Sequence, residues 1–289
     1  MSILNDTYTL SNNVEIPKLG LGTWLMDDAE AERAVRLAAD AGYRMIDTAQ
    51  AYGNEKGVGA GVRTCGIPRD QLFVATKVAA EHKSYEAARQ SIDESLAKLG
   101  LDYVDQIIIH SPQPWVEVNQ SDNRYERENL EVWRALEDAW AAGKARVIGV
   151  SNFNEHDLTN IIDNAAVLPQ VNQILAHISN TPMELISFCQ EKGILVEAYS
   201  PIAHGMVLDN PLVTETAARY GVSPAQLCLR YCLQLGMLPL PKTSKPAHIA
   251  SNADVDFEIS PSDMEALLAA EHISDYGDSS FFPVFGGKL

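Results

Sequence analysis

Short apolar runs alternate with longer amphipathic segments along most of the chain. A short apolar run rich in Val, Ile and Leu between two amphipathic segments is typical of a strand in a parallel sheet, which is covered on both faces. Eight runs fit this description, at residues 18–24, 45–46, 72–76, 104–109, 147–150, 170–172, 194–198 and 237–240. We therefore expect eight buried strands.

Each run is followed by a segment with helical features. The segment from Asp27 to Ala41 is rich in alanine, acidic at its start and closed by Gly42, which are start and stop signals of a helix. Further helices are expected from residue 54, over 84–99, up to 142, over 155–165, over 183–191 and up to 235. Two longer loops remain between elements, from Ser111 to about Glu128 and from Ser200 to Asn210.

Eight strand–helix units in unbroken order predict an α/β fold, a (β/α)8 TIM barrel. We expect one domain over residues 1–289, with a hairpin at residues 8–16 in front of it and a C-terminal tail, residues 272–289, over the active-site rim. A doubly wound open sheet is the competing architecture. No Gly-x-Gly-x-x-Gly turn follows an early strand, and eight units exceed what an open sheet usually needs.

Composition narrows the class of protein. A chain of 289 residues suits one barrel, and 46% hydrophobic with 21% charged residues is the balance of a soluble enzyme. No stretch approaches the roughly 20 apolar residues that span a bilayer, and the N-terminus lacks a basic region followed by an apolar one. We expect a cytoplasmic protein with no membrane partner.

Charge and cysteine usage exclude further classes. The net charge of -17 repels polyanions, so nucleic acid is not an expected partner, and a small anionic ligand would need a local basic patch. The cysteines, Cys65, Cys189, Cys228 and Cys232, are scattered without metal-ligand spacing. We expect them to be reduced and mostly buried, and we expect no metal site.

Polar side chains stand where the predicted strands end. Met45 and Ile46 lead into Asp47, and Tyr52 follows five residues later. The residues expected at the strand ends are Asp47, Lys77, His110, Ser151, Asn152, Gln173, Tyr199 and Lys242. In a barrel these ends converge on the rim where active sites are built. The alternative is that Asp47 caps the next helix and Tyr52 merely packs.

This set suits proton transfer to a carbonyl oxygen. Tyrosine ordinarily has a pKa near 10, which makes it a sluggish acid at neutral pH. A nearby lysine lowers that pKa, and an aspartate fixes and charge-balances the lysine. A neutral imidazole at His110 could hold the substrate oxygen through a ring N–H, although a lone histidine is more often structural.

Several motifs resemble those of the aldo-keto reductases. They are Gly20 to Trp24, Gly42 to Ala49, Tyr52 to Glu55, Thr76-Lys77, Asp105 to His110, Gly149 to Phe153, Val171 to Gln173 and Ala198 to Pro201. The resemblance runs in unbroken order from about residue 8 to about residue 260. It implies a catalytic tetrad of Asp47, Tyr52, Lys77 and His110, in which Tyr52 donates the proton when hydride from a reduced nicotinamide reaches a carbonyl carbon.

The resemblance also implies a cofactor site. Ser151, Asn152 and Gln173 would hydrogen-bond the nicotinamide carboxamide, and Tyr199 would stack on the ring. The further cofactor residues that it implies are Gly22, Thr23, Asp47, Ser200, Ile202, Lys242, Thr243, Ser244, His248 and Asn252. Barrels commonly bind phosphate after their seventh and eighth strands, and Lys242, Lys245 and His248 supply the basic patch there.

Two departures bear on cofactor choice. His248 stands where the family commonly has arginine, and Ser251 where it commonly has glutamate. Histidine ordinarily titrates near pH 6.5, whereas arginine stays charged. We expect NADPH as the cofactor, with NADH as a weaker alternative.

The expected substrate is a small aldehyde or ketone, including dicarbonyl or keto-sugar-like compounds, and the expected state is a monomer. The implied substrate-binding residues are Trp24, Tyr52, His110, Ser111 and Trp115, with Phe281 or Phe282 as further candidates from the tail. Many relatives carry tryptophan where Ser111 stands, so a roomier pocket is expected. Two rival hypotheses are a regulatory or structural subunit, and an aldolase in which Lys77 forms a Schiff base.

Overall fold

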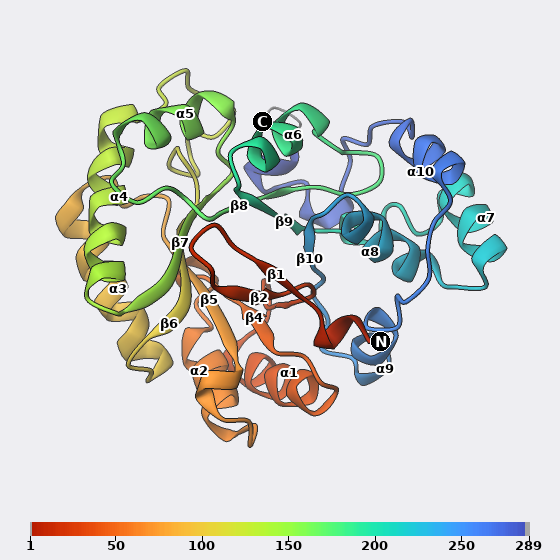
Figure 1. The fold of residues 1–289 in the computed structure, drawn as a ribbon, viewed down its shortest axis with the longest axis horizontal. Helices are drawn as coiled ribbons and strands as arrows, with labels where there is room; N and C mark the ends of the chain where they lie inside the picture. The colour runs from red at the N-terminus through yellow and green to blue at the C-terminus, as the bar shows by residue number, and fades with distance from the viewer. Residues whose placement is uncertain (1, 287–289) are drawn as a thin grey trace.

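Eight parallel strands form a nearly closed barrel in the computed structural model, which describes residues 2–286 (Figure 1). Neighbouring strands follow one another in the sequence, from β3 to β10. Their bounds are β3 Leu21–Gly22, β4 Met45–Asp47, β5 Phe73–Val78, β6 Val104–Ile109, β7 Ala145–Ser151, β8 Val171–Leu175, β9 Leu195–Tyr199 and β10 Leu238–Leu240. The (β/α)8 barrel predicted from the sequence is confirmed.

The first and last strands meet to close the barrel. The N–H of Gly20 donates to the carbonyl of Pro239 at 3.3 Å, and the N–H of Gly22 donates to Pro241 at 3.1 Å. Gly22 also forms a parallel bridge with Lys242. A Cβ at Gly22 would lie 3.1 Å from the Leu240 carbonyl oxygen, so a side chain would crowd this seam.

Helices cover the outside of the barrel (Figure 1). Their bounds are α1 Asp28–Asp40, α2 Glu55–Thr64, α3 Tyr85–Leu99, α4 Glu126–Ala141, α5 Glu155–Asn164, α6 Met183–Glu191, α7 Pro211–Tyr220, α8 Pro224–Gln234, α9 Pro246–Asn252 and α10 Pro261–Leu268. Local chemistry sets the ends of α3: the Ser84 side chain accepts from the N–H of Ala87, and Gly100 ends the helix in the left-handed region.

The lower part of the barrel interior is apolar and is closed by the N-terminal hairpin. This hairpin pairs β1, Thr7–Thr9, with β2, Glu15–Pro17, and both strands lie across the barrel in Figure 1. Leu10 and Ile16 pack with inward side chains of the barrel strands, among them Met45, Phe73, Ile108, Val147 and Leu238. Water is thereby excluded from the floor beneath the polar residues above.

Several predicted strand boundaries were wrong. Asp47, Ser151 and Tyr199 are the last residues of β4, β7 and β9 rather than the first residues after them. Lys77 and Gln173 lie inside their strands rather than after them, since β5 continues to Val78 and β8 to Leu175. A polar side chain that faces the barrel interior does not interrupt the backbone ladder, and Lys77 stays in register with Ile108. The first barrel strand spans only two residues, because Thr23 already turns away to hydrogen-bond the Asp47 carbonyl.

The N-terminal hairpin differs from its prediction by one residue at each end.

Over residues 2–286, no helix combines the length and the apolar character needed to cross a membrane.

Candidate functional site

Lys77 and Asp47 form a buried ion pair at the upper end of β4 and β5. The Lys77 ammonium lies 2.7 Å from both Asp47 carboxylate oxygens and also donates to the Thr48 carbonyl oxygen at 2.9 Å. Both side chains are almost fully shielded from solvent. These three contacts hold the Lys77 nitrogen as a hydrogen-bond donor beside a carboxylate, which opposes the attack of a neutral amine on a carbonyl.

Tyr52 lies directly above this pair. It ends a 3-10 turn, Gln50–Tyr52, and the Lys77 nitrogen is 5.0 Å from the centre of its ring. Burial, and next the charge of Asp47, raise the pKa of Tyr52 well above its ordinary value. The expected lowering by Lys77 is not seen, because the ammonium hydrogens point to Asp47 and Thr48 instead. The Tyr52 phenol therefore keeps its proton at working pH.

His110 follows β6 and faces Tyr52, with 5.6 Å between the ring centres. Burial, and next the charge of Lys77, hold the pKa of His110 well below its ordinary value. Its imidazole is therefore neutral, as the sequence suggested. Within the described residues its buried Nδ1 has no hydrogen-bond partner.

A hydrogen-bond network joins the ends of four strands. The Tyr199 hydroxyl donates to the Asn152 side-chain oxygen at 2.7 Å. The Asn152 amide in turn donates to the His110 carbonyl and to Ser151 Oγ, both at 3.0 Å, while Ser151 Oγ donates to the Gln173 carbonyl at 2.8 Å. Asn152 adopts a left-handed φ of 63°, which asparagine tolerates better than most residues. The network fixes these side chains relative to His110.

Gln173 connects the ion pair to a second carboxyl group that sequence reasoning missed. Its side-chain nitrogen donates to Asp47 at 3.0 Å and to Glu197 at 2.7 Å. Gln106 also donates to Glu197, at 3.1 Å. Burial raises the pKa of Glu197 to about 7. The available signal was an acidic residue inside the apolar run of β9, two positions before Tyr199 and therefore on the same face of the strand.

A pocket of about 70 Å³ opens above Tyr52 and His110. Its walls come from several strand ends and from the C-terminal segment. The lining residues are Trp24, Tyr52, His110, Trp115, Ser151, Asn152, Gln173, Tyr199, Ser200, Phe282, Val284 and Phe285.

The wall next to His110 differs from the expectation. Ser111 is buried and does not line the pocket, and its hydroxyl accepts from the N–H of Gln113. Trp115 instead packs edge-on against His110, with ring centres 4.9 Å apart. It also packs against Phe282, with 4.8 Å between ring centres. The predicted roomier pocket is absent from this conformation, because Trp115 and Phe282 fill that side. Exposed Phe281 does not line the pocket.

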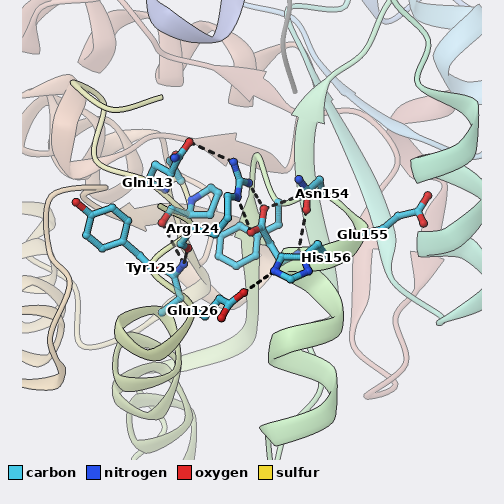
Figure 2. A network of polar contacts seen from close by, with 12 residues as sticks. Gln113, Arg124, Tyr125, Glu126, Asn154, Glu155 and His156 are labelled. Atoms are coloured by element: carbon cyan, nitrogen blue, oxygen red, sulfur yellow. Dashed lines mark hydrogen bonds and ion pairs between the residues drawn. The ribbon is translucent and has the colours of Figure 1, made fainter. Parts of the chain in front are cut away.

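A polar network holds the loop that carries Trp115 (Figure 2). Arg124 donates from Nε to Asp157 at 3.0 Å and from its terminal nitrogen to Gln113 at 3.2 Å. Asp157 also belongs to the capping box that begins α5 with Asn154. The loop after β6 is thereby tied to the start of α5, which directly follows the Ser151–Asn152 strand end.

The C-terminal segment is pinned over the pocket at several points. His204 contacts Ser200 Oγ at 3.0 Å through Nε2 and Ser279 Oγ at 3.1 Å through Nδ1. The Asn119 amide donates to the Pro283 carbonyl at 2.8 Å. Phe285 then packs on the His204 ring, with 4.8 Å between ring centres. The tail therefore covers the rim, and Val284 and Phe285 line the same pocket as Gln173 and Tyr199.

The residues expected at the phosphate end lie after β10. Lys242, Lys245 and His248 are exposed there, while Asn252 is buried in α9. Thr243 is buried, and its hydroxyl accepts from the N–H of Lys245. Ser244 and Ile202 are half-buried, whereas Thr23 is buried and its hydroxyl donates to the Asp47 carbonyl. Gly22 lies where the first and last barrel strands meet.

The barrel and its rim define an oxidoreductase-type site with a buried lysine–aspartate pair beneath a tyrosine and a histidine. Residues 18–271 match the model of the aldo/keto reductase family. The chain is 41% identical to the glyoxal reductase of Bacillus subtilis over 268 residues, which is 92% of this chain and 93% of that protein. The protein belongs to the aldo-keto reductase family and is an oxidoreductase.

Solved structures agree with this assignment. The chain is similar to an aldo/keto reductase from Brucella melitensis at a TM-score of 0.84 and 38% identity, covering 91% of this chain and 98% of that one. It is also similar to the aldo-keto reductase of Bombyx mori in complex with NADP, at a TM-score of 0.84 and 32% identity, covering 98% and 99%. Within residues 2–286, no group of three or more metal-ligating side chains is present.

Proposed function

We propose that this protein reduces the carbonyl group of small aldehydes or ketones to alcohols with NADPH, using Tyr52 as the proton donor. The observation that carries the proposal is the protonated Tyr52 phenol, which lines the pocket beside neutral His110 and above the Lys77–Asp47 pair. The cofactor supplies hydride to the carbonyl carbon when it is bound.

Asp47, Tyr52, Lys77 and His110 have different roles at the substrate oxygen. His110 donates a hydrogen bond from its ring and orients the carbonyl towards Tyr52. As negative charge develops on the oxygen, Tyr52 gives up its proton. Lys77 stabilises the resulting phenolate by its positive charge, and Asp47 holds Lys77 in place. The low dielectric of the closed barrel strengthens each of these interactions.

The donors and acceptors at the rim fit a nicotinamide. Gln173 lines the pocket, and its side-chain oxygen makes no hydrogen bond within residues 2–286, so it can accept from the carboxamide NH2. Ser151 and Asn152 stand beside it, and Tyr199 presents a flat ring. Relatives solved in complex with NADP and with NADPH support this cofactor.

NADPH rather than NADH is the proposed main cofactor. Lys242, Thr243, Ser244, His248 and Asn252 would hold the adenosine 2'-phosphate, and exposed Lys242 supplies positive charge in a chain of net charge -17. Gly22, Thr23, Ser200 and Ile202 would complete the site. Because His248 replaces a permanently charged arginine, NADH is proposed as a weaker alternative.

Dicarbonyl compounds are the first substrates to test. The glyoxal reductase of Bacillus subtilis is 41% identical to this chain, and glyoxal is the smallest dicarbonyl. The pocket that the substrate would enter beside the nicotinamide is walled largely by aromatic side chains. Trp24, Tyr52, His110 and Trp115 are its proposed walls; Ser111 acts only by shaping the loop behind them.

We further propose that the chain works as a single-domain monomer in the cytoplasm. Every candidate residue comes from one chain and one barrel, so no second copy is needed to complete the site. Its four cysteines are free, and three are buried, which suits a reducing compartment. Sedimentation at micromolar concentration tests the monomer, and a dimer would contradict it.

The test of the main proposal is the loss of reduced-nicotinamide absorbance when the protein is mixed with NADPH and a panel of aldehydes, ketones and dicarbonyls. We expect turnover with small carbonyl compounds and slower turnover with NADH. Absence of turnover with every compound, despite cofactor binding, would favour a regulatory subunit. Trapping of a substrate on Lys77 by borohydride would favour an aldolase.

A further inference from the structure

Glu197 is a fully buried carboxyl group that the four residues of the proposed reaction do not use. It lies one strand from Gln173, and the two residues are direct partners in the parallel pairing of β8 with β9. Its Oε2 accepts from the amides of both Gln106 and Gln173. Its Oε1 has no partner within the described residues, and neither has the side-chain oxygen of Gln106.

One nitrogen of Gln173 therefore links two carboxyl groups. The Asp47 carboxylate has the Lys77 ammonium as its counter-ion, whereas Glu197 is satisfied only by neutral amides. The charged groups that face Glu197 are Asp47 on β4 and Lys77 on β5, and β10 contributes only Leu238, Pro239 and Leu240 to this sheet. With Glu197 ionised, the cluster carries one negative charge in excess.

This arrangement occupies the side-chain nitrogen of Gln173. Because its nitrogen is held from below by two carboxyl groups, its oxygen is left for the cofactor carboxamide. The charge state of Glu197 is thus transmitted over one hydrogen-bonded side chain to the place proposed for the nicotinamide ring.

The two forms of the cofactor differ in charge at that ring. The nicotinamide of NADP+ is positively charged, and that of NADPH is neutral, while their phosphates are the same. An ionised carboxyl group hydrogen-bonded to a pocket residue would stabilise the oxidised form selectively, because charge–charge attraction is strong in a buried site.

We propose that Glu197 is a positioning residue that adjusts the charge of the reductase site. Its ionised form favours bound NADP+ over bound NADPH, and binding of NADP+ releases the proton of Glu197. This inference rests on the proposed cofactor site. Burial raises the pKa of Glu197 to about 7, so the exchange falls in the working pH range. Mildly acidic conditions then favour release of NADP+ after reduction.

Linkage gives the sign of the expected effect. If NADP+ binds more tightly to the ionised form, its affinity rises as pH increases through the pKa of Glu197, and its binding releases protons near neutral pH. The ratio Kd(NADP+)/Kd(NADPH) in wild type should therefore fall by about three- to tenfold between pH 6 and pH 8. Contributions from the 2'-phosphate and His248 are common to both forms and cancel in the ratio.

The matched variant is Glu197→Gln, whose oxygen can still accept from Gln173 but cannot ionise. Dissociation constants for both forms would be measured by protein fluorescence, and proton release by calorimetry in two buffers of different ionisation heat. The expected result is a pH-independent ratio and no excess proton release with NADP+ in the variant. Unchanged pH dependence in Glu197→Gln, or a flat ratio in wild type, would overturn the inference.

A second variant covers failure of Glu197→Gln to fold. Gln106→Met removes one hydrogen bond that favours the ionised carboxyl, so the inflection of the wild-type ratio should move to higher pH; an unmoved inflection would overturn the inference. Carbon NMR of the glutamate carboxyls in the cofactor-free protein gives a readout independent of binding, and Glu197 should titrate near neutral pH. Lack of binding of either form would remove the proposed function as well, whereas binding with a flat ratio removes this inference alone.

Discussion

Lys77 directs its ammonium group to both carboxylate oxygens of Asp47, at 2.7 Å each, and the pair is closed off from solvent by the barrel floor below and Tyr52 above. A buried ion pair of this kind is costly to break, because the remaining charge has no partner and no water. The pair also fixes the Lys77 ammonium at 5.0 Å from the centre of the Tyr52 ring.

Breaking the pair from either side should destabilise the fold. We expect Lys77→Met or Asp47→Asn to lower the free energy of unfolding by about 3–5 kcal/mol, as measured in urea. The double variant should recover much of the loss, since no charge is left unpaired, but should not recover activity. Arg36→Met, which removes an exposed ion pair with Glu32, is the control and should change stability by less than about 1 kcal/mol. A double variant as unstable as the sum of the single ones would contradict this account.

The buried carboxyl of Glu197 should make stability depend on pH. The pKa of Glu197 is raised from 4.5 to about 7 by burial, so the native state binds more protons than the unfolded state between these values. Stability conferred by the protonated group is therefore lost as pH rises through this window. At pH 8 we expect Glu197→Gln to be more stable than wild type. The free energy of unfolding of the variant minus that of wild type should rise by about 3 kcal/mol between pH 4.5 and pH 8.

Urea unfolding at several pH values measures this effect. Glu258→Gln alters an exposed glutamate and should leave the pH slope of wild type unchanged. A Glu197→Gln slope equal to that of wild type would show that Glu197 ionises alike in the folded and unfolded chain.

Phe285 should limit the size of the substrate. Its ring packs on His204 and lines the pocket, which holds only about 70 Å³, well below the 300 Å³ or more of typical ligand sites. We expect Phe285→Ala to raise kcat/KM for bulky ketones relative to small aldehydes by roughly tenfold. Phe281→Ala, at a ring that is 72% exposed, is the control and should change neither. A uniform change for both substrate classes would show that the tail does not select by size.

Much of the fold and rim followed from the sequence because the evidence for it is local. Apolar runs and capping residues predicted the strands and helices, and the carboxyl ends of parallel strands placed Asp47, Lys77, His110 and Tyr199 at one rim. Strand ends were predicted less accurately, since the inward-facing Lys77 looks like a boundary in the sequence but continues the ladder.

The remaining features depend on contacts between distant parts of the chain. Glu197 and Gln106 form a hydrogen bond although they are 91 positions apart in the sequence. Phe285, in the C-terminal segment, packs on the ring of His204, which lies after β9. The effect of Ser111 on the pocket depended on whether Trp115 would turn towards His110. No periodicity or turn signal carries such information, and the pKa of Tyr52 likewise depends on burial that only the packed barrel creates.

His248→Arg should strengthen NADPH preference. Arginine is charged at every working pH and can contact a phosphate with two parallel hydrogen bonds, so we expect the ratio of kcat/KM for NADPH to that for NADH to rise by roughly tenfold at pH 8. NADH is the internal control because it lacks the 2'-phosphate, and its kcat/KM should hardly change. Ionic strength must be kept constant, since phosphate contacts are sensitive to salt. An unchanged ratio would mean that His248 takes no part in cofactor choice.

The proposed reaction depends most on proton donation by Tyr52 at a site assembled by Lys77, Asp47 and His110. Its most direct test is the rate of NADPH oxidation by Tyr52→Phe with a small aldehyde, together with NADPH binding to the same variant. We expect the rate to fall by about 10²–10⁴-fold, because only the proton donor is lost, while the dissociation constant stays within a few-fold of wild type. A variant that retains full activity would contradict the assignment of Tyr52.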